Sequence, residues 1–368
     1  MRAVVIEVRT EKFQKTKIQE LKELARSAGY DVVKEIVQKR WKPDPAYLIG
    51  KGKLKELKSF VEKESIDIII FSNNLKANQV FRIRKELGWN IDVIDRNILI
   101  LKIFEERSRT AEAKMQIELA RLHYMLPWVR EYLRFRDLYG EQVGWGALGE
   151  YLHKVYEQHI TKRIKLLERK LEKVRMRNFE RIVKRREYGL PEVVLTGYTQ
   201  AGKTELFNKL TCETKPVGLG PFTTLSTCSR RLSMISNYRN EIVVVDSIGF
   251  IEDMHPIILN AFYTTLNELA LSDLIVLVVD GAEEINEIKR KINVSHEIIS
   301  KIAPSVELII ALNKIDRIKN EDIERVVKVV KEVFPYTDVI PISAKKSINL
   351  DTLVEKIIEK INKLQYKV

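Results

Sequence analysis

Residues 197–204, with the sequence Gly-Tyr-Thr-Gln-Ala-Gly-Lys-Thr, restrict the possible folds of this chain more than any other segment. They match the pattern G-x-x-x-x-G-K-[ST], which belongs between a buried strand and a helix. The flanking residues supply both elements, since 192–196 form a short apolar run and 205–210 have a helical pattern. The sequence therefore predicts an α/β domain in which this turn gathers backbone N–H groups at a helix N-terminus, an arrangement suited to phosphate.

Every residue of this turn has an expected place in a nucleotide site. Backbone N–H groups would surround the phosphates, the Lys203 ammonium would reach the β- and γ-phosphates, and the Thr204 hydroxyl would ligate Mg²⁺. The expected contacts are Gly197, Tyr198, Thr199, Gln200, Ala201, Gly202, Lys203 and Thr204. The competing interpretation is a glycine turn between a strand and a helix, with no ligand.

Two further motifs would sense the γ-phosphate and its metal. The loop 218–226 contains three expected contact residues, Phe222, Thr223 and Thr224. We assign the Mg²⁺ role to Thr224 and keep Thr223 as the alternative. The next apolar run, 242–245, ends in the pattern D-x-x-G, so Asp246 would hold Mg²⁺ through water and the Gly249 N–H would contact the γ-phosphate.

Two motifs near the C-terminus predict recognition of guanine. Asn313, Lys314 and Asp316 follow the apolar run 308–312. The Asp316 carboxylate can accept hydrogen bonds from guanine N1–H and from its exocyclic amine, a donor pair that adenine lacks. The triplet Ser343, Ala344 and Lys345 follows a strand expected at 338–342 and would place the Ala344 N–H on guanine O6. The expected cofactors are therefore GTP or GDP and Mg²⁺.

The residue after the D-x-x-G glycine predicts slow hydrolysis. In Ras-like proteins a glutamine there orients the attacking water, but this chain has Phe250, which cannot hydrogen-bond water. The expected catalytic groups are Lys203, Thr224 and Gly249. The water would then be ordered by the Thr224 backbone, by a partner macromolecule or by His255.

The N-terminal region, residues 1–108, alternates between apolar runs and helical patterns. Strands are predicted at 3–8, 31–37, 66–71 and 91–94, and helices at 17–28, 54–62, 78–87 and 97–104. This alternation favours a small α/β domain with a mostly parallel sheet. The turn Gly50-Lys51-Gly52-Lys53 could bind a phosphate, although a tight turn with solvated lysines is the interpretation we prefer.

Residues 109–188 predict an antiparallel, self-paired helical hairpin. Two apolar seams at heptad spacing flank a glycine-containing linker at 140–149. The seams are Met115, Leu119, Leu122, Leu126, Val129, Leu133, and then Ile160, Ile164, Leu167, Leu171, Val174. Between Tyr151 and Glu187 there are 13 Lys or Arg against 5 Asp or Glu, an excess of eight positive charges. This excess is more than half of the net charge of +13 of the whole chain. The hairpin could therefore bind an RNA backbone by counterion release, and a solvated helix face is the alternative.

The remaining composition restricts the setting of the protein. Of 368 residues, 45% are hydrophobic and 31% charged, as in soluble globular proteins. The two cysteines, Cys212 and Cys228, have neither metal-ligand spacing nor a disulfide framework. The N-terminus lacks a signal-peptide pattern, and no run approaches the ~18 apolar residues of a membrane span. We therefore expect a cytoplasmic protein without stable membrane insertion, and self-paired helices favour a monomer.

Taken together, the chain resembles the HflX-type GTPases of the translation-factor-related class. The segments that support the resemblance are 50–53, 93–96, 103–110, 116–120, 222–225, 246–251 and 261–262. It implies an N-terminal α/β domain (1–108), a helical hairpin that forms an antiparallel coiled coil (109–188) and a Ras-like P-loop GTPase domain (189–368) with helices on both faces of a mostly parallel sheet. It also implies GTPase activity, binding to the large ribosomal subunit and its rRNA, and in some members the splitting of stalled ribosomes.

Three other functions are compatible with parts of the sequence. A P-loop ATPase or kinase acting on a small molecule would share residues 197–204 but not the guanine contact of Asp316. An RNA-binding module could use the nucleotide only to stabilise its fold. Docking on an anionic membrane would use the same positive charge, although no hydrophobic anchor accompanies it.

Overall fold

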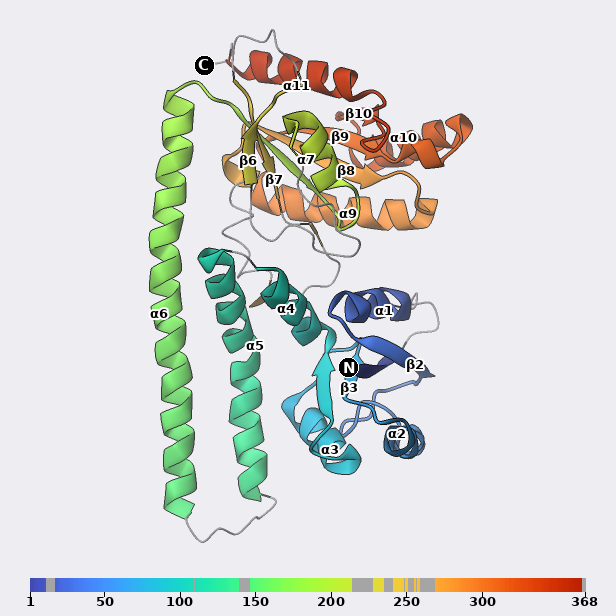
Figure 1. Ribbon diagram of the computed structural model, residues 1–368, viewed down its shortest axis with the longest axis vertical. Coiled ribbons are helices and arrows are strands. Elements are labelled where there is room, and N and C mark those ends of the chain that lie inside the picture. Colours follow the sequence, from blue (N-terminus) through green and yellow to red (C-terminus); the bar gives the residue numbers. More distant parts are fainter. Residues whose placement is uncertain are drawn as a thin grey trace. The chain divides into compact units, whose positions relative to one another are not determined.

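The computed structural model describes residues 1–10, 17–108, 110–138, 146–213, 228–234, 241–247, 249–250, 255, 257–258 and 269–365, without the side chains of 132–138, 146–156, 186 and 365. The chain forms two compact units (Figure 1). Unit 1 comprises Met1–Glu172 with His255–Ala261, and unit 2 comprises Lys173–Met254 with Phe262–Val368. This division falls within one long helix, and the domain boundaries at 108 and 188 stay a prediction.

Unit 1 contains a four-stranded parallel sheet in the order β2-β1-β3-β4. Its strands are β1 (Arg2–Arg9), β2 (Asp31–Lys39), β3 (Ile68–Phe71) and β4 (Asp92–Asp95), and its first four helices are α1 (Ile18–Ser27), α2 (Lys51–Glu64), α3 (Ala77–Leu87) and α4 (Arg96–Arg107). All four residues of β3 are buried, because a parallel strand inside an α/β sheet has both faces covered. Each of the eight elements expected from the sequence is present, with ends shifted by a few residues.

The helical hairpin also forms, from α5 (Ala111–Leu138) and α6 (Gly146–Glu187). Ion pairs join Glu118 to Arg163 (2.6 Å) and Arg130 to Glu157 (2.5 Å). Later residues of α5 therefore pair with earlier residues of α6, as antiparallel helices require. Gly146, which we expected in the linker, is instead the first residue of α6; residues 139–145 lie outside the described part.

Unit 2 contains a six-stranded sheet in the order β10-β9-β8-β5-β7-β6, in which β6 is antiparallel to β7 and the other pairs are parallel. The strands are β5 (Glu192–Gly197), β6 (Cys228–Arg231), β7 (Val243–Asp246), β8 (Leu274–Asp280), β9 (Glu307–Asn313) and β10 (Asp338–Pro341). The helices are α7 (Lys203–Thr211), α9 (Ile285–Ile302), α10 (Asn320–Val333), α11 (Leu350–Gln365) and the 3₁₀ turn η1 (Ile315–Arg317). The predicted α/β fold class with a mostly parallel sheet is confirmed.

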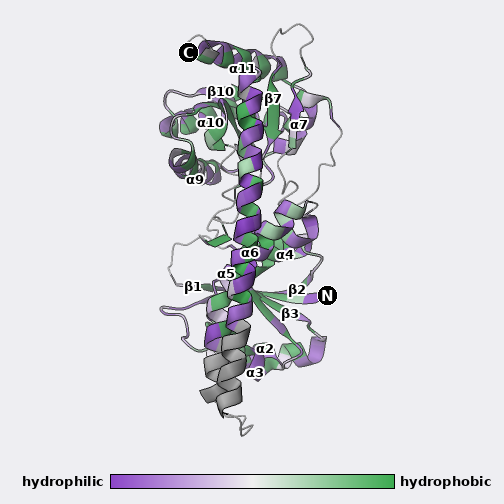
Figure 2. Cartoon of the chain, turned by 90° about the vertical axis from the view of Figure 1, so that its left-hand side faces the viewer, coloured by the Kyte–Doolittle hydropathy of each residue, from purple (hydrophilic) through white to green (hydrophobic). Residues whose placement is uncertain are grey.

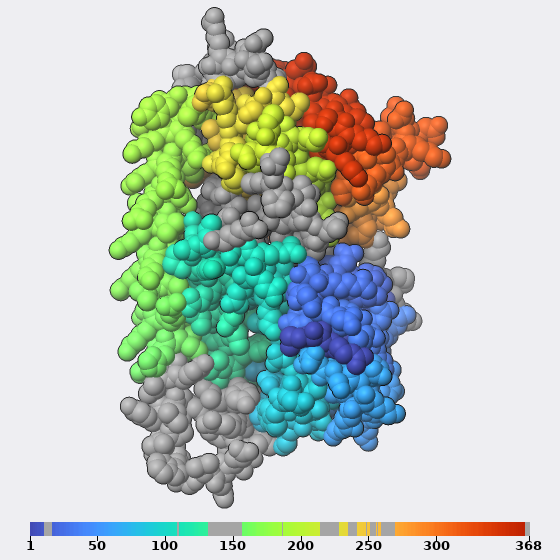
Figure 3. Space-filling model, viewed as in Figure 1, coloured from blue at the N-terminus to red at the C-terminus, as the bar shows by residue number. Residues whose placement is uncertain are grey.

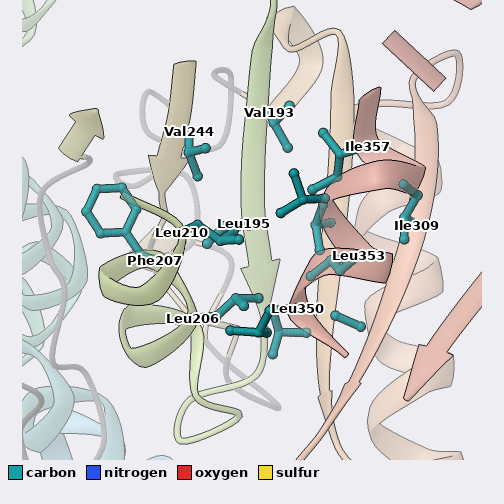
Figure 4. Packing of buried hydrophobic residues seen from close by; sticks show 14 of the residues in the cluster. Val193, Leu195, Leu206, Phe207, Leu210, Val244, Ile309, Leu350, Leu353 and Ile357 are labelled. Carbon is teal, nitrogen blue, oxygen red and sulfur yellow. The ribbon is translucent and has the colours of Figure 1, made fainter. Parts of the chain in front are cut away.

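One hydrophobic cluster joins this sheet to α7 and α11 (Figure 4). Leu206 and Phe207 of α7 and Leu353 of α11 are fully buried in it. Because α7 begins directly after the 197–202 turn, this packing fixes the direction in which the turn faces. The strands consist mainly of hydrophobic residues, whereas the described part of α6 is largely hydrophilic (Figure 2).

The end of α6 is anchored within unit 2. The Arg185 guanidinium donates to the buried carboxylate of Glu192 (2.9 Å) and to the Ser229 hydroxyl (2.9 Å). These contacts connect α6 to β5 and β6. Within the described residues, no helix is both long enough and apolar enough to cross a membrane.

Candidate nucleotide site

The turn 197–204 leaves the carboxyl end of β5 and begins α7. Gly197 has φ +136° and Gly202 φ +94°, conformations that favour glycine. A β-carbon would lie 2.2 Å from Val278 O at Gly197 and 2.3 Å from Asn313 Nδ2 at Gly202. Gly197 is therefore required by the backbone of the neighbouring strand as well as by its own conformation, whereas a side chain at Gly202 would have to displace the Asn313 amide.

Lys203 is buried beneath this turn. Its ammonium donates to Gly197 O (3.0 Å) and Tyr198 O (2.6 Å). Burial lowers the pKa of Lys203 to about 8, although the Asp246 carboxylate opposes the shift. The ammonium thus spans the turn where we expected it to meet phosphate, and a phosphate bound there would compete with the two carbonyls.

Thr204 and Asp246, the two described metal-ligand candidates, meet at the same edge of the sheet. The Thr204 hydroxyl donates to Asp246 Oδ2 (3.2 Å), and both residues are buried. They meet because β5 and β7 are adjacent and Leu195 is in register with Asp246. A hydroxyl beside a carboxylate is a hard oxygen donor set, which fits Mg²⁺.

The D-x-x-G glycine lies against the turn. A β-carbon on Gly249 would lie 2.7 Å from Lys203 Nζ and 3.0 Å from Thr199 N. The next residue, Phe250, is buried, and its backbone donates to Gly197 O (2.9 Å) and accepts from Thr199 N (3.1 Å). The Thr199 N–H that we expected at the phosphates therefore bonds to Phe250 in this structure.

Asn313 joins three segments of the site that are far apart in the sequence. Its Nδ2 donates to Ala201 O (2.8 Å), and its Oδ1 accepts from Ala344 N (2.9 Å). The Ala344 N–H, predicted to contact guanine O6, is therefore bonded to Asn313 here, and a guanine would have to share or replace that bond.

Lys314 and Asp316, which the sequence predicts to contact the base, lie one and three residues after Asn313. Lys314 Nζ donates to Gln200 O (2.8 Å) and to Asp280 Oδ2 (2.5 Å). The Ser343 hydroxyl donates to Asp316 Oδ1 (2.7 Å), and this bond lowers the pKa of Asp316. Asp316 therefore remains ionised near neutral pH, as an acceptor for guanine N–H groups requires. Lys345 is exposed beside this turn.

Two features of the site were missing from the sequence prediction. Asp280, the last residue of β8, pairs with Lys314, and the Gly281 N–H donates to Asn313 O (2.8 Å). An acidic residue followed by glycine at the end of an apolar strand is the signal that could have revealed them. The predicted contacts Phe222, Thr223 and Thr224 lie outside the described residues.

Two weaker candidates from the sequence belong to unit 1. His255 belongs to unit 1, where its ring contacts that of Tyr124 edge to face, with centroids 5.0 Å apart. In the 50–53 turn, the Gly50 N–H donates to Gln38 Oε1 (2.9 Å), and α2 begins at the next residue. That geometry matches the tight turn that we preferred.

This fold and this turn define a P-loop GTPase domain. Family models agree along the chain: one described as "GTP-binding GTPase N-terminal" matches residues 15–105, one described as "GTP-binding GTPase Middle Region" matches 107–186, and one described as "50S ribosome-binding GTPase" matches 192–314.

Full-length relatives identify the family. GTPase HflX of Methanocaldococcus jannaschii is 42% identical over 95% of this chain and 84% of its own length. GTPase HflX of Thermofilum pendens is 39% identical over 93% of this chain and 79% of its own length. The chain belongs to the HflX family of GTPases, which confirms the resemblance seen in the sequence, and as a member it is a GTP-hydrolysing enzyme.

Solved structures extend the likeness over the whole chain. A GTP-binding protein, SsGBP, crystallised with GDP, is 30% identical, with a TM-score of 0.56 and 99% of each chain covered. A GTP-binding protein from Sulfolobus solfataricus, also in complex with GDP, is 30% identical, with a TM-score of 0.51, 99% of this chain covered and 100% of that one.

Proposed function

We propose that this protein is a slow, Mg²⁺-dependent GTPase that binds the large ribosomal subunit through rRNA and changes its affinity when GTP is hydrolysed. The main support is the meeting of Lys203, Thr204, Asp246 and Asp316 at one edge of the unit 2 sheet. Relatives crystallised with GDP support guanine nucleotide as the ligand. We also propose that the protein acts as a monomer in the cytoplasm.

In this proposal the turn 197–204 holds the phosphates and Asp316 selects guanine. Lys203 would exchange its two carbonyl acceptors for phosphate oxygens. Thr204, Asp246 and Thr224 would hold Mg²⁺, which neutralises charge on the β- and γ-phosphates. Gly249 would donate its N–H to the γ-phosphate, and release of its segment after hydrolysis would act as the switch.

Hydrolysis by the isolated protein is expected to be slow. Phe250 replaces the water-orienting glutamine, and its side chain is buried. Without a group to position water, we expect turnover near the intrinsic Ras-like scale of ~10⁻⁴ to 10⁻² per second. Acceleration by ribosomal subunits would show that a partner completes the site.

Ribosome binding is supported by the charge of α6 and by the description of the family model that matches unit 2. Lys165, Arg169 and Lys173 are exposed and spaced by four residues, so they project from one side of the helix. Contacts between such side chains and rRNA phosphates would release counterions, so binding should weaken as salt rises. Splitting of stalled ribosomes would be one consequence of such binding.

Co-sedimentation with separated ribosomal subunits tests the proposal. We expect binding to the large subunit that falls with salt and is stronger with a GTP analogue than with GDP. The double variant Lys165→Glu/Arg169→Glu should lose most of this binding, whereas the matched pair Lys328→Glu/Lys331→Glu, on the exposed side of α10, should not. Binding indifferent to salt, nucleotide and α6 charge would reject the proposal.

Co-sedimentation also tests the alternative of an RNA-binding module. An RNA-binding module with a purely structural nucleotide would bind subunits equally well after Lys203→Ala. The other alternative, a P-loop ATPase acting on a small molecule, does not agree with membership of the HflX family of GTPases.

A further inference from the structure

A cavity of about 590 Å³ lies within unit 1, along β4. Helices α3, α4 and α5 supply its other walls, and β4 is the last strand of the described sheet on that side. In Figure 3 these helices are the cyan and teal parts of the surface. All lining residues belong to unit 1, so this cavity is separate from the nucleotide site.

Apolar side chains form most of its lining. Phe81 of α3, Ile94 of β4 and Ile98 of α4 are buried, and Met125 and Trp128 of α5 are half-buried beside them. The spacing of the lining residues explains this arrangement, because residues three and four apart on a helix share one face. A ligand with an apolar body would therefore displace water from an apolar wall.

Four charged residues also line the cavity, and three of them are cations. Arg84, Lys102 and Arg121 stand against one carboxylate, Asp92. Lys102 Nζ lies 3.8 Å from Asp92 Oδ2, and Arg84 donates to Trp89 O (2.8 Å). Since Trp89 precedes β4 and Asp92 begins it, both cations lie at the end of the cavity where β4 starts.

The third cation lies near the same region. Arg121 is paired with Glu105 (3.0 Å), which is three residues after Lys102 on α4. The Arg121 and Lys102 side chains are 50% and 35% exposed. Arg121 can turn towards a ligand by leaving the exposed Glu105, whereas Lys102 also donates to the hydroxyl of the buried Tyr30 (3.2 Å) and would share or exchange that bond. The cavity thus combines an apolar interior with a positively charged end.

We propose that this cavity is a binding site for a small amphipathic anion, with an apolar body and one carboxylate or phosphate head group. The volume is in the range of small-molecule sites, which are mostly apolar with a few polar groups that fix orientation. The body would lie against Phe81 and Trp128, and the head group would meet Lys102, Arg84 and Arg121. This inference does not depend on the proposed ribosome binding.

Binding of eight-carbon probes to the full chain tests the proposal by calorimetry. Octanoate and octyl phosphate carry the two possible anionic heads, and octanol and octylamine are matched controls. We expect at least one anion to bind with a dissociation constant below 1 mM, and the neutral and cationic probes to bind at least tenfold more weakly. Failure of both anions to bind, or equal binding of octanol, would overturn the proposal.

Two variants place the binding in this cavity. Val80→Trp fills part of it, and Lys102→Met/Arg121→Met removes two cations; each should weaken anion binding at least tenfold. The control Lys55→Met/Lys58→Met, on the exposed face of α2, should leave it unchanged. Thermal unfolding and GTP hydrolysis verify that each variant is folded. Unchanged anion binding in both folded cavity variants would also overturn the proposal.

Discussion

Both units are built on parallel sheets with helices, but the carboxyl ends of their strands differ. In unit 1 the carboxyl ends of β1 and β3 are joined by Asn73, which follows β3. Its side-chain oxygen accepts from Val8 N, and its side-chain nitrogen donates to Val8 O (2.8 Å each). In unit 2 the turn 197–204 occupies the corresponding edge, with glycines that let neighbouring strands approach closely. The carboxyl edge of the sheet is therefore closed by side chains in unit 1, whereas in unit 2 it holds the turn that we propose as the phosphate site.

A buried polar network also lies at the carboxyl end of β4 in unit 1. Asp95, fully buried, accepts from the Tyr124 hydroxyl (2.6 Å) and caps α4 through Ile98 N (3.0 Å). Asn97 donates to the same Tyr124 oxygen (3.1 Å). Burial raises the pKa of Asp95 and of Tyr124, so the phenol stays protonated as the donor. The comparison teaches that the loops and side chains that follow the strands decide whether the carboxyl edge of a parallel sheet is filled or left to a glycine-containing turn.

The largest effect is expected from Lys203→Ala, which removes the buried cation of the unit 2 edge. GTP hydrolysis should fall about 1,000-fold, since electrostatic stabilisation of the transferred phosphoryl group is lost. Lys209→Ala, exposed on the same helix, is the matched control. Phosphate release under single-turnover conditions measures both. Residual activity within a few-fold of the wild type would show that Lys203 does not stabilise the transferred phosphoryl group.

Asp316→Asn should have the next largest effect. The amide can no longer accept two hydrogen bonds from guanine, so GTP affinity should fall about 100-fold, at roughly 1.5 kcal/mol for each bond to a charged group. Xanthosine triphosphate, whose base offers the complementary pattern, should gain affinity. Competition against a fluorescent GDP analogue measures both ligands. Unchanged nucleotide preference would refute guanine recognition by Asp316.

Tyr124→Phe tests the closed edge of unit 1. Loss of the hydroxyl leaves the buried Asp95 with one fewer donor, and this should lower the free energy of unfolding by about 2 kcal/mol. Affinity for GDP should not change, because the network is structural. Denaturant unfolding and GDP titration separate the two. A variant with normal stability but weakened GDP binding would show that the two edges are linked.

The pH dependence of GDP affinity should give the smallest effect. Lys203 has a pKa near 8 in the free protein, and phosphate favours its charged form. Binding above pH 8 therefore requires proton uptake, and the dissociation constant should rise up to ~10-fold per pH unit there, while staying flat below about pH 7.5. Lys203→Ala supplies the control for titration of guanine itself. An equally steep rise in that variant would exclude Lys203 as the cause.

Much of the fold followed from local sequence patterns. The eight elements of the first 108 residues and the hairpin of α5 and α6 were predicted because hydrophobic spacing is set within each element. The end of the linker was misplaced, since Gly146 begins α6 despite the low helix propensity of glycine. A glycine is tolerated at the first position of a helix, because the first N–H groups of a helix have no partner within it.

The sequence by itself determined the turn at 197–204 and its order relative to Asp246, Asp316 and Ser343, because each lies beside an apolar strand of its own. Only the tertiary structure decided that Asn313 connects Ala201 to Ala344, that Asp280 pairs with Lys314, and that Asn73 closes the unit 1 edge. Those contacts depend on which strands become neighbours. Sheet order is a property of the whole packed chain, and no local spacing encodes it.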